Sequence, residues 1–253
     1  TTASKTIFIG RNAGDAVTTT GGSNVSDGTV GIGHDALSAL TSGQRNVAVG
    51  YLALAGLTTG DYNTALGWGA ADSFGVDEQE NVAVGNSAMG TFDQGANSNI
   101  DGNVAIGSNA FLGADLGSVT VNVYDNIAIG RNALNATADN AQTGTVAIGG
   151  NALTALTSGA NNVAVGFESG KVLTTGVQNT LLGYRSGFDL SEGGRNTAVG
   201  YLAFGGALDA NGDESFDNTF VGTGAGSGAW VTAVSNKNTA VGSQSMIGAM
   251  NGS

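Results

Sequence analysis

Short apolar runs closed by glycine alternate with polar, turn-rich segments along the whole chain. The clearest runs read Asn-Val-Ala-Val-Gly at residues 46–50 and 81–85, and Asn-Ile-Ala-Ile-Gly at 126–130. Thirteen such pentads occur, and their closing glycines lie 17 to 23 residues apart. A repeat of this length indicates a stack of similar coils instead of one globular core. The closing glycines are Gly10, Gly33, Gly50, Gly67, Gly85, Gly107, Gly130, Gly149, Gly166, Gly183, Gly200, Gly222 and Gly242.

Each position of the pentad accepts few side chains. The residue before the glycine is always Val, Ile or Leu, and the residue three before it is always Val, Ile or Thr. This β-branched chemistry predicts a short strand. Three residues after the glycine stands Ala in ten repeats and Ser in three, so a closely packed second wall is expected. Helix-forming stretches such as 151–156 are too short to compete.

The repeat length predicts how each coil is built. A glycine at the end of every strand indicates a positive φ or a close approach of backbones. A period of about 17 to 23 residues leaves room for two strands and two turns per coil. We therefore expect an all-β, parallel β-solenoid of about 13 rungs, formed by residues 1–253 as a single repetitive domain.

The position four before the glycine is Asn in ten repeats, and Thr6, Thr29 and Thr145 replace it in the others. Carboxamides stacked one above another can form a ladder in which each side chain satisfies the next. A structural role for this column is expected over an Asn-based binding surface, because every rung carries the position.

Aromatic residues follow the glycine where the spacing is 17: Tyr51 and Trp68 in one run, and Phe167, Tyr184 and Tyr201 in another. Rings one rung apart can stack. Two interpretations stay open, namely stabilisation between rungs and an aromatic strip that binds carbohydrate.

Alternation along a strand puts the aliphatic and β-branched columns on one face and the Ala and Asn columns on the other. A coil can bury one face within itself. The Ala stripe would then be exposed unless another molecule covers it. The sequence thus predicts a small homo-oligomer with its Ala side packed inward.

Composition narrows the partners and the chemistry. The chain has 44 Gly, no Pro and no Cys, so disulfides and thiolate metal sites are excluded. Eight Lys and Arg against 20 Asp and Glu give a net charge of −12, which argues against nucleic acid. No apolar run is long enough to span a bilayer, so membrane insertion is not expected. The first residues lack the apolar stretch of a signal peptide.

The pentads, each followed by Ala three residues later, resemble the head repeats of trimeric autotransporter adhesins of the YadA type over essentially the whole chain. The segment Asn196 to Tyr201, Asn-Thr-Ala-Val-Gly-Tyr, is similar to repeats of phage tail fibres. The resemblance implies a left-handed parallel β-roll, a homotrimer, and binding of a host cell-surface glycan or protein. The adhesin family's rungs are usually shorter and more uniform, and its stalk, coiled coil and membrane anchor are not found here.

Rungs longer than 17 residues must loop out their extra residues, and loops on a rigid scaffold are the usual place for recognition. Such loops are expected between Phe74 and Asp125, between Leu208 and Asp217, and around Trp230. The candidate ligand-binding residues are Tyr51, Trp68, Phe92, Phe111, Tyr124 and Trp230.

One acidic loop has part of a calcium-binding pattern. Oxygen-bearing side chains alternate at Asp209, Asn211 and Asp213, and Asp217 follows. The glycine expected at the sixth place is Glu214, and the twelfth place is Phe220. A solvated acidic turn is therefore favoured, and calcium is the only cofactor the sequence suggests.

The sequence gives little support for a catalytic function, because His34 is the only histidine and no nucleophile with a matching base is visible. We expect a non-enzymatic fibre segment that attaches to a host surface, on a phage tail fibre; the alternative is the head of a bacterial adhesin. Both are extracellular. A polysaccharide-degrading solenoid and an ice-binding face with the pairs 58–59 and 174–175 are the remaining interpretations.

Overall fold

The computed structural model describes residues 5–17, 26–92, 99–113, 122–136, 142–205, 215–228 and 236–247. The chain divides into two compact units, Thr1–Asn126 and Ile127–Ser253, and each is treated by itself. The same repeat builds both. All regular elements of the described residues are strands, and no helix occurs among them.

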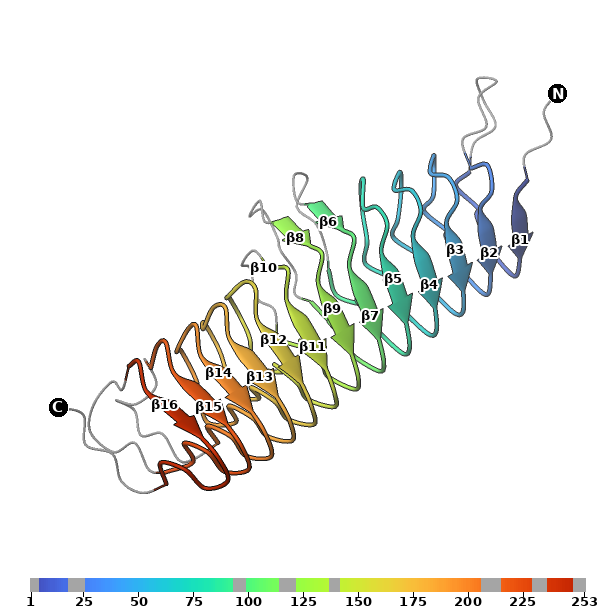
Figure 1. The fold of residues 1–253 in the computed structure, drawn as a ribbon. Coiled ribbons are helices and arrows are strands. Elements are labelled where there is room, and N and C mark those ends of the chain that lie inside the picture. The colour runs from blue at the N-terminus through green and yellow to red at the C-terminus, as the bar shows by residue number, and fades with distance from the viewer. Residues whose placement is uncertain are drawn as a thin grey trace. The chain divides into compact units, whose positions relative to one another are not determined.

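In the first unit, six three-residue strands lie side by side in chain order and form a parallel sheet (Figure 1). Their registers align the middle residues, so that Gly31, Ala48, Ala65, Ala83 and Ala105 follow one another across it. Two further strands in longer loops, β6 (Asn99–Asp101) and β8 (Asn122–Tyr124), pair with each other in parallel. The six strands are β1 (Ile7–Ile9), β2 (Val30–Ile32), β3 (Val47–Val49), β4 (Thr64–Leu66), β5 (Val82–Val84) and β7 (Val104–Ile106).

The second unit repeats this arrangement with seven strands, again parallel and in chain order (Figure 1). The short strand β10 (Gln142–Thr143) lies in the loop between the first and second of these seven strands. The seven are β9 (Ile127–Ile129), β11 (Val146–Ile148), β12 (Val163–Val165), β13 (Thr180–Leu182), β14 (Thr197–Val199), β15 (Thr219–Val221) and β16 (Thr239–Val241). The prediction of an all-β parallel β-solenoid is confirmed. The number of rungs, the hand of the coil, the single domain and the trimer stay predictions.

Most coils contain one strand, where two were expected, and stacked turns form the second wall. In the turn after Gly50, Leu52 and Leu54 have φ of 58° and 51°. Leu52 donates its N–H to His34 of the preceding coil, and Leu54 donates to Ala70 of the next. Left-handed backbone therefore aims successive N–H groups at both neighbouring coils, which satisfies them without a second strand.

The closing glycine is required by the distance between coils. Gly50 has a φ of 142°, and a Cβ on it would collide with the carbonyl oxygen of Gly67 in the next coil. The same relation recurs at ten of the other closing glycines, whereas a Cβ on Gly242, after the last strand, would meet no neighbouring atom. Close backbone approach between coils thus explains the strictest position of the repeat.

The Ala column corrects the predicted orientation of the strands. Ala48, Ala65, Ala128 and Ala147 are completely buried inside their own coils. The Val, Ile, Leu and Thr columns on either side are half-buried or exposed. The small residue faces inward because turn residues fill the interior opposite it. An oligomer packed through an Ala stripe is therefore wrong, and the uncovered face of the sheet is the aliphatic one.

The interior of most coils is filled by size matching between the middle residue of the strand and the turn residue six positions later. Where the middle of the strand is Ala48, the turn residue six positions later is the buried Leu54. Where the middle is Leu181, the matching residue is Gly187, whose Cβ would lie 2.7 Å from the Leu181 Cδ2 atom. One large and one small residue thus fill the space that interior packing density demands.

The Asn ladder predicted from the sequence is confirmed. Asn46 Oδ1 accepts hydrogen bonds from Asn63 N (2.9 Å) and Asn63 Nδ2 (3.2 Å), and Asn63 Oδ1 accepts the same pair from Asn81. In seven of these residues Nδ2 also donates to a backbone carbonyl of a neighbouring turn, such as Gly60 O for Asn46. The column is buried, so its function is to hold one coil to the next.

Candidate functional site

The position after the closing glycine points outward at the end of each strand and carries the exposed aromatic rings. In the first unit, His34, Tyr51 and Trp68 stack with centroid separations of 5.3 and 6.0 Å and interplanar angles of 22° and 11°. Tyr51 is 44% exposed and Trp68 is 53% exposed. These three residues are called the first aromatic strip. Asp35 lies against it, with its Oδ2 2.7 Å from His34 Nδ1.

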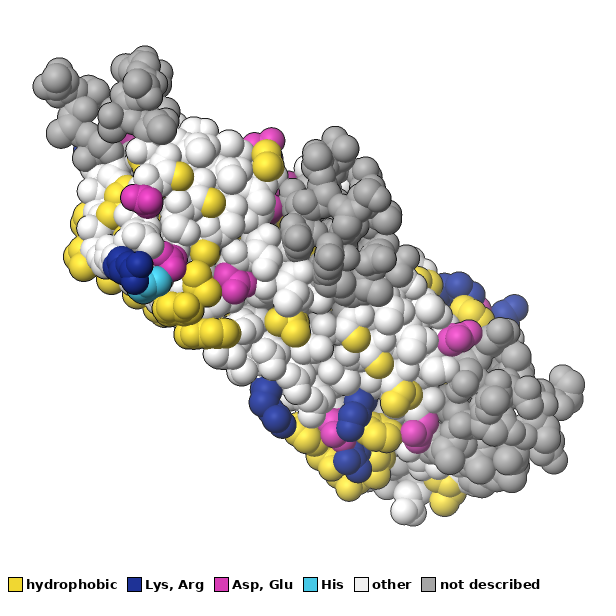
Figure 2. Space-filling model, turned by 180° about the vertical axis from the view of Figure 1, so that it is seen from behind, with side chains coloured by type: hydrophobic (Ala, Val, Ile, Leu, Met, Phe, Trp, Pro, Cys, Tyr) yellow, Lys and Arg dark blue, Asp and Glu magenta, His cyan; other side chains and the backbone are white. Residues whose placement is uncertain are grey.

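The second unit repeats the arrangement. Phe167, Tyr184 and Tyr201 stack at 5.8 and 5.2 Å with angles of 15° and 9°, and all three are exposed. They are called the second aromatic strip. Figure 2 shows hydrophobic side chains gathered in patches at the edge of the molecule; Lys or Arg side chains lie beside the His at one patch and among the hydrophobic side chains of another. Both strips stabilise neighbouring coils by stacking and still leave ring surface uncovered.

A buried carboxylate holds two cations beside the second aromatic strip. Glu168 is buried, its Oε1 accepts from Lys171 Nζ at 2.8 Å, and its Oε2 accepts from Arg185 Nε at 2.7 Å. Hydrogen bonds from Lys171 and Arg185 hold the pKa of Glu168 below its usual value. The Arg185 guanidinium also lies over the rings of Tyr184 and Phe188, 5.3 and 4.9 Å from their centroids. The ion pairs with Glu168 thus hold Lys171 and Arg185 in place beside the rings.

Two of the predicted ligand-binding aromatics lie in the core. Phe92 is 1% exposed, Phe111 is completely buried, and the two rings pack edge to face at 5.0 Å. Phe111 lies six positions after Ala105, at the buried turn position, and Phe92 packs against Phe111 and Gly113, so the two rings are not surface residues. The sequence did not predict this, because an aromatic residue in a long coil can equally well lie in an exposed loop or fill the core.

The other candidates are more scattered. Tyr124 is half-buried in β8, and its hydroxyl accepts a hydrogen bond from Asn99 Nδ2 at 3.0 Å. Trp230 lies outside the described residues. Tyr51 and Trp68 are therefore the only two of the six predicted residues that the described structure brings together on the surface, since Phe92 and Phe111 meet in the core.

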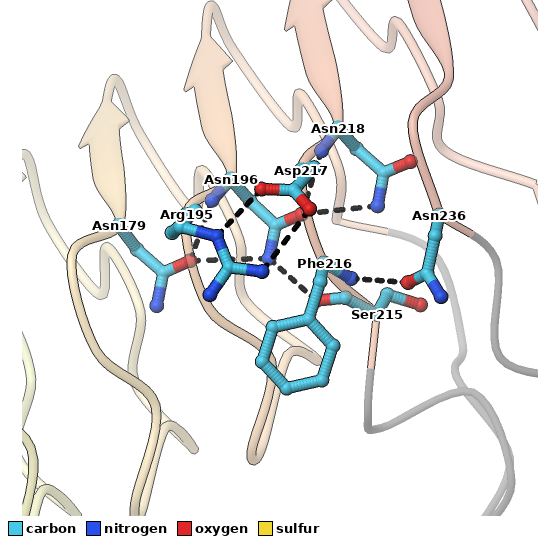
Figure 3. Close-up of polar contacts among 8 residues, drawn as sticks. All are labelled: Asn179, Arg195, Asn196, Ser215, Phe216, Asp217, Asn218 and Asn236. Atoms are coloured by element: carbon cyan, nitrogen blue, oxygen red, sulfur yellow. Dashed lines mark hydrogen bonds and ion pairs between the residues drawn. The ribbon is translucent and has the colours of Figure 1, made fainter.

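The residue of the calcium loop that the structure describes is engaged in an ion pair. Asp217 accepts from Arg195 Nε at 2.6 Å and Nη2 at 3.1 Å, which occupies both carboxylate oxygens (Figure 3). Arg195 thereby lowers the pKa of Asp217. Asp209, Asn211 and Asp213 lie outside the described residues. Among the part of the chain that is described, no group of three or more acidic, His or Cys side chains could hold a metal ion.

A buried acid in the first unit was not anticipated as a special group. Glu78 is completely buried, Gly75 N donates to its Oε1 at 2.7 Å, and its Oε2 has no hydrogen-bond partner. Burial raises the pKa of Glu78 to about 7, and the neighbouring carboxylate of Asp101 adds to the rise. The sequence Asp77-Glu78-Gln79-Glu80 has no feature that distinguishes the buried Glu78 from its exposed neighbours.

No family model, curated protein or solved structure matches this chain. Within the described residues, no helix is long and apolar enough to cross a membrane.

Proposed function

We propose that this chain is a structural and adhesive fibre segment, belonging to a phage tail fibre, which assembles with copies of itself and attaches to a host surface. The uncharged, uncovered outer face of its parallel sheets carries the proposal. No catalysis is assigned to the chain.

The outer face is formed by the first and third residues of the six strands β1–β5 and β7 in the first unit and the seven strands β9 and β11–β16 in the second. All of them are Val, Ile, Leu or Thr, in both units. Exposure is large for side chains of this kind, reaching 57% at Ile9, 49% at Leu66 and 38% at Ile106 in the first unit. A charge-free aliphatic band of this length is not expected on a protein that works alone in water.

A second copy of the chain is the occupant that best fits this face. Parallel sheets occur almost only with both faces covered, and the inner face here is covered by the chain's own turns. The outer face repeats the same chemistry on every coil, so one copy can match another in register along it. Closed cyclic symmetry satisfies all such faces at once, and the resemblance to trimeric adhesins favours three copies.

Charge placed on this face tests the proposal. The double variant Leu66→Lys and Ile106→Lys should shift the protein toward monomer in sedimentation velocity, because apposed copies would bury unpaired ammonium groups. Gln79→Lys, an exposed residue among acidic neighbours, is the matched control and should leave the mass unchanged. Equal masses for all three proteins would reject the aliphatic face as the interface.

The head of a bacterial trimeric adhesin is the second candidate, because the pentads resemble that family equally well. The two differ in where the chain is found. Gold-labelled antibody raised against this protein should decorate the tips of phage particles and not the surface of bacterial cells. Decoration of the bacterial surface alone would favour the adhesin.

A further inference from the structure

We propose that the second aromatic strip, together with Lys171 and Arg185, binds an acidic saccharide chain through its carboxylate and its sugar rings. The inference rests on the proposed attachment function and names the class of ligand for one surface of the second unit.

The rings offer apolar surface at a suitable spacing. Their centroids are 5.2 to 5.8 Å apart, which is more than the ~3.5 Å contact distance of fully overlapping rings, so the stack is offset. Each ring then keeps part of a face and an edge free, and exposure is 39% at Tyr184 and 53% at Tyr201. The step from ring to ring is comparable to the length of one pyranose residue. Successive sugars can therefore rest their C–H faces on successive rings.

The strip ends in a ring with an open face. The residue after the next closing glycine is Thr223, so no further ring stacks on Tyr201 from that side. At the other end Gly150 occupies the position, and the ring of Phe167 lies against it. A saccharide approaching from the Tyr201 end meets a free aromatic face first.

The two cations supply the donors that a carboxylate needs. Arg185 uses Nε for Glu168, and its Nη1 and Nη2 have no hydrogen-bond partner among the described residues. Two parallel N–H groups on a planar guanidinium match a carboxylate in a bidentate pair. Lys171 is 36% exposed and Arg185 is 38% exposed, so both are accessible. Glu168 fixes their positions beforehand, which lowers the entropic cost of binding.

The first aromatic strip provides an internal comparison. It has a similar stack of three rings with the carboxylate of Asp35 against it, and Arg11 holds the same column position one coil before His34. In the described structure, however, no cation lies over its rings and no buried carboxylate holds a pair of cations beside them. The two strips therefore separate the contribution of the cations from that of the rings.

Calorimetric titration with hexagalacturonate and with its fully methyl-esterified form tests the assignment, because esterification removes the carboxylate charges and keeps the sugar rings. The wild-type protein should bind the acid at least ten-fold more tightly than the ester. Arg185→Gln should weaken binding of the acid about ten-fold, and Arg185→Lys should weaken it less. Tyr201→Ala should also weaken it, and Trp68→Ala, in the first aromatic strip, should not. Circular dichroism melts show that each variant is folded.

Three results would overturn the assignment: no heat with the acid, equal affinity for acid and ester, or equal losses in Trp68→Ala and Tyr201→Ala. Failure here is distinct from failure of the fibre proposal. An oligomer that ignores both saccharides removes only the assigned ligand, whereas a monomer that binds the acid removes only the proposed assembly.

Discussion

Buried Asn side chains join each coil to the next through hydrogen bonds. Asn196 donates twice to Asn179 Oδ1, donates to Ser215 O at 2.8 Å, and accepts twice from Asn218 (Figure 3). A buried donor or acceptor left without a partner costs about 1–3 kcal/mol. The ladder is therefore a source of register as well as stability.

Asn196→Ala should lower the free energy of unfolding by about 3 kcal/mol, because it leaves polar groups of both neighbouring coils without a partner. Chemical denaturation monitored by circular dichroism measures the change. Asn86→Ala, at an exposed position after a closing glycine, serves as the control and should have little effect. Similar losses in both variants would contradict a structural ladder.

Glu78 should make stability depend on pH. Its pKa is about 7 in the folded protein, against 4.5 in the unfolded chain. Below pH 4.5 both states are protonated and nothing is lost. As the pH rises toward 7 only the unfolded chain releases the proton, so the folded state is progressively destabilised, by about 3 kcal/mol in all. Above the folded pKa the loss is complete.

Thermal melts between pH 5 and pH 8 measure this effect. The melting temperature of the wild type should fall across the range, and Glu78→Gln, which cannot ionise, should fall less. Asp101→Asn is a useful companion, since burial raises the pKa of Asp101 in the same direction. A slope unchanged in Glu78→Gln would show that another group is responsible.

The residue columns explain which parts of the structure could be predicted from sequence. The strand, the closing glycine and the Asn ladder each depend on one position with a narrow choice, so the pattern was sufficient. The inward orientation of Ala48 could not be predicted from the sequence, because it depends on the left-handed turn that brings the Leu54 side chain into the interior of the coil. The burial of Phe92 and the buried state of Glu78 depend on loop paths that no periodic position encodes.

At the scale of the element, most coils pair one large residue with one small residue, one from the strand and one from the turn. Where both are small, as in the coil of Ala164 and Gly170, leucines of the neighbouring coils reach the space beside the glycine. Leu181 in the strand is paired with Gly187 in the turn, whereas Ala198 is paired with Phe204. Glycine at the turn position is thus selected for space as well as for backbone conformation, since Leu54 adopts the same positive φ.

Exchanging the two sizes in one coil should be tolerated. Leu181→Ala alone should cost about 3 kcal/mol through the cavity it leaves, and Gly187→Leu alone should destabilise by crowding Leu181. The double variant should recover most of both losses, because it reproduces the pair found at Ala48 and Leu54. Additive losses in a double-mutant cycle would contradict size matching.

Metal removal belongs to the same scale, because the loop before β15 contains the calcium-like pattern. Both oxygens of Asp217 are engaged by Arg195. We therefore expect EGTA to leave the melting temperature unchanged. A fall of several degrees that added calcium restores would assign a calcium site to this loop.

At the scale of the whole molecule, the inner face of the sheets is buried and the outer face is partly exposed. The inner face is filled by the chain's own turns. The outer face carries only aliphatic and Thr side chains, and exposing such apolar surface to water is energetically unfavourable. The association we propose follows from the same repeat that produces the coil, and the attachment surface we propose, the second aromatic strip, directly follows strands of this face.

The mass of the particle in solution tests this account most directly. Light scattering on the size-exclusion peak should give three times the 24.8 kDa of one chain, with a far-ultraviolet spectrum typical of β-structure. A stable species of 24.8 kDa at micromolar concentration would contradict it, because the aliphatic face would then persist in water uncovered.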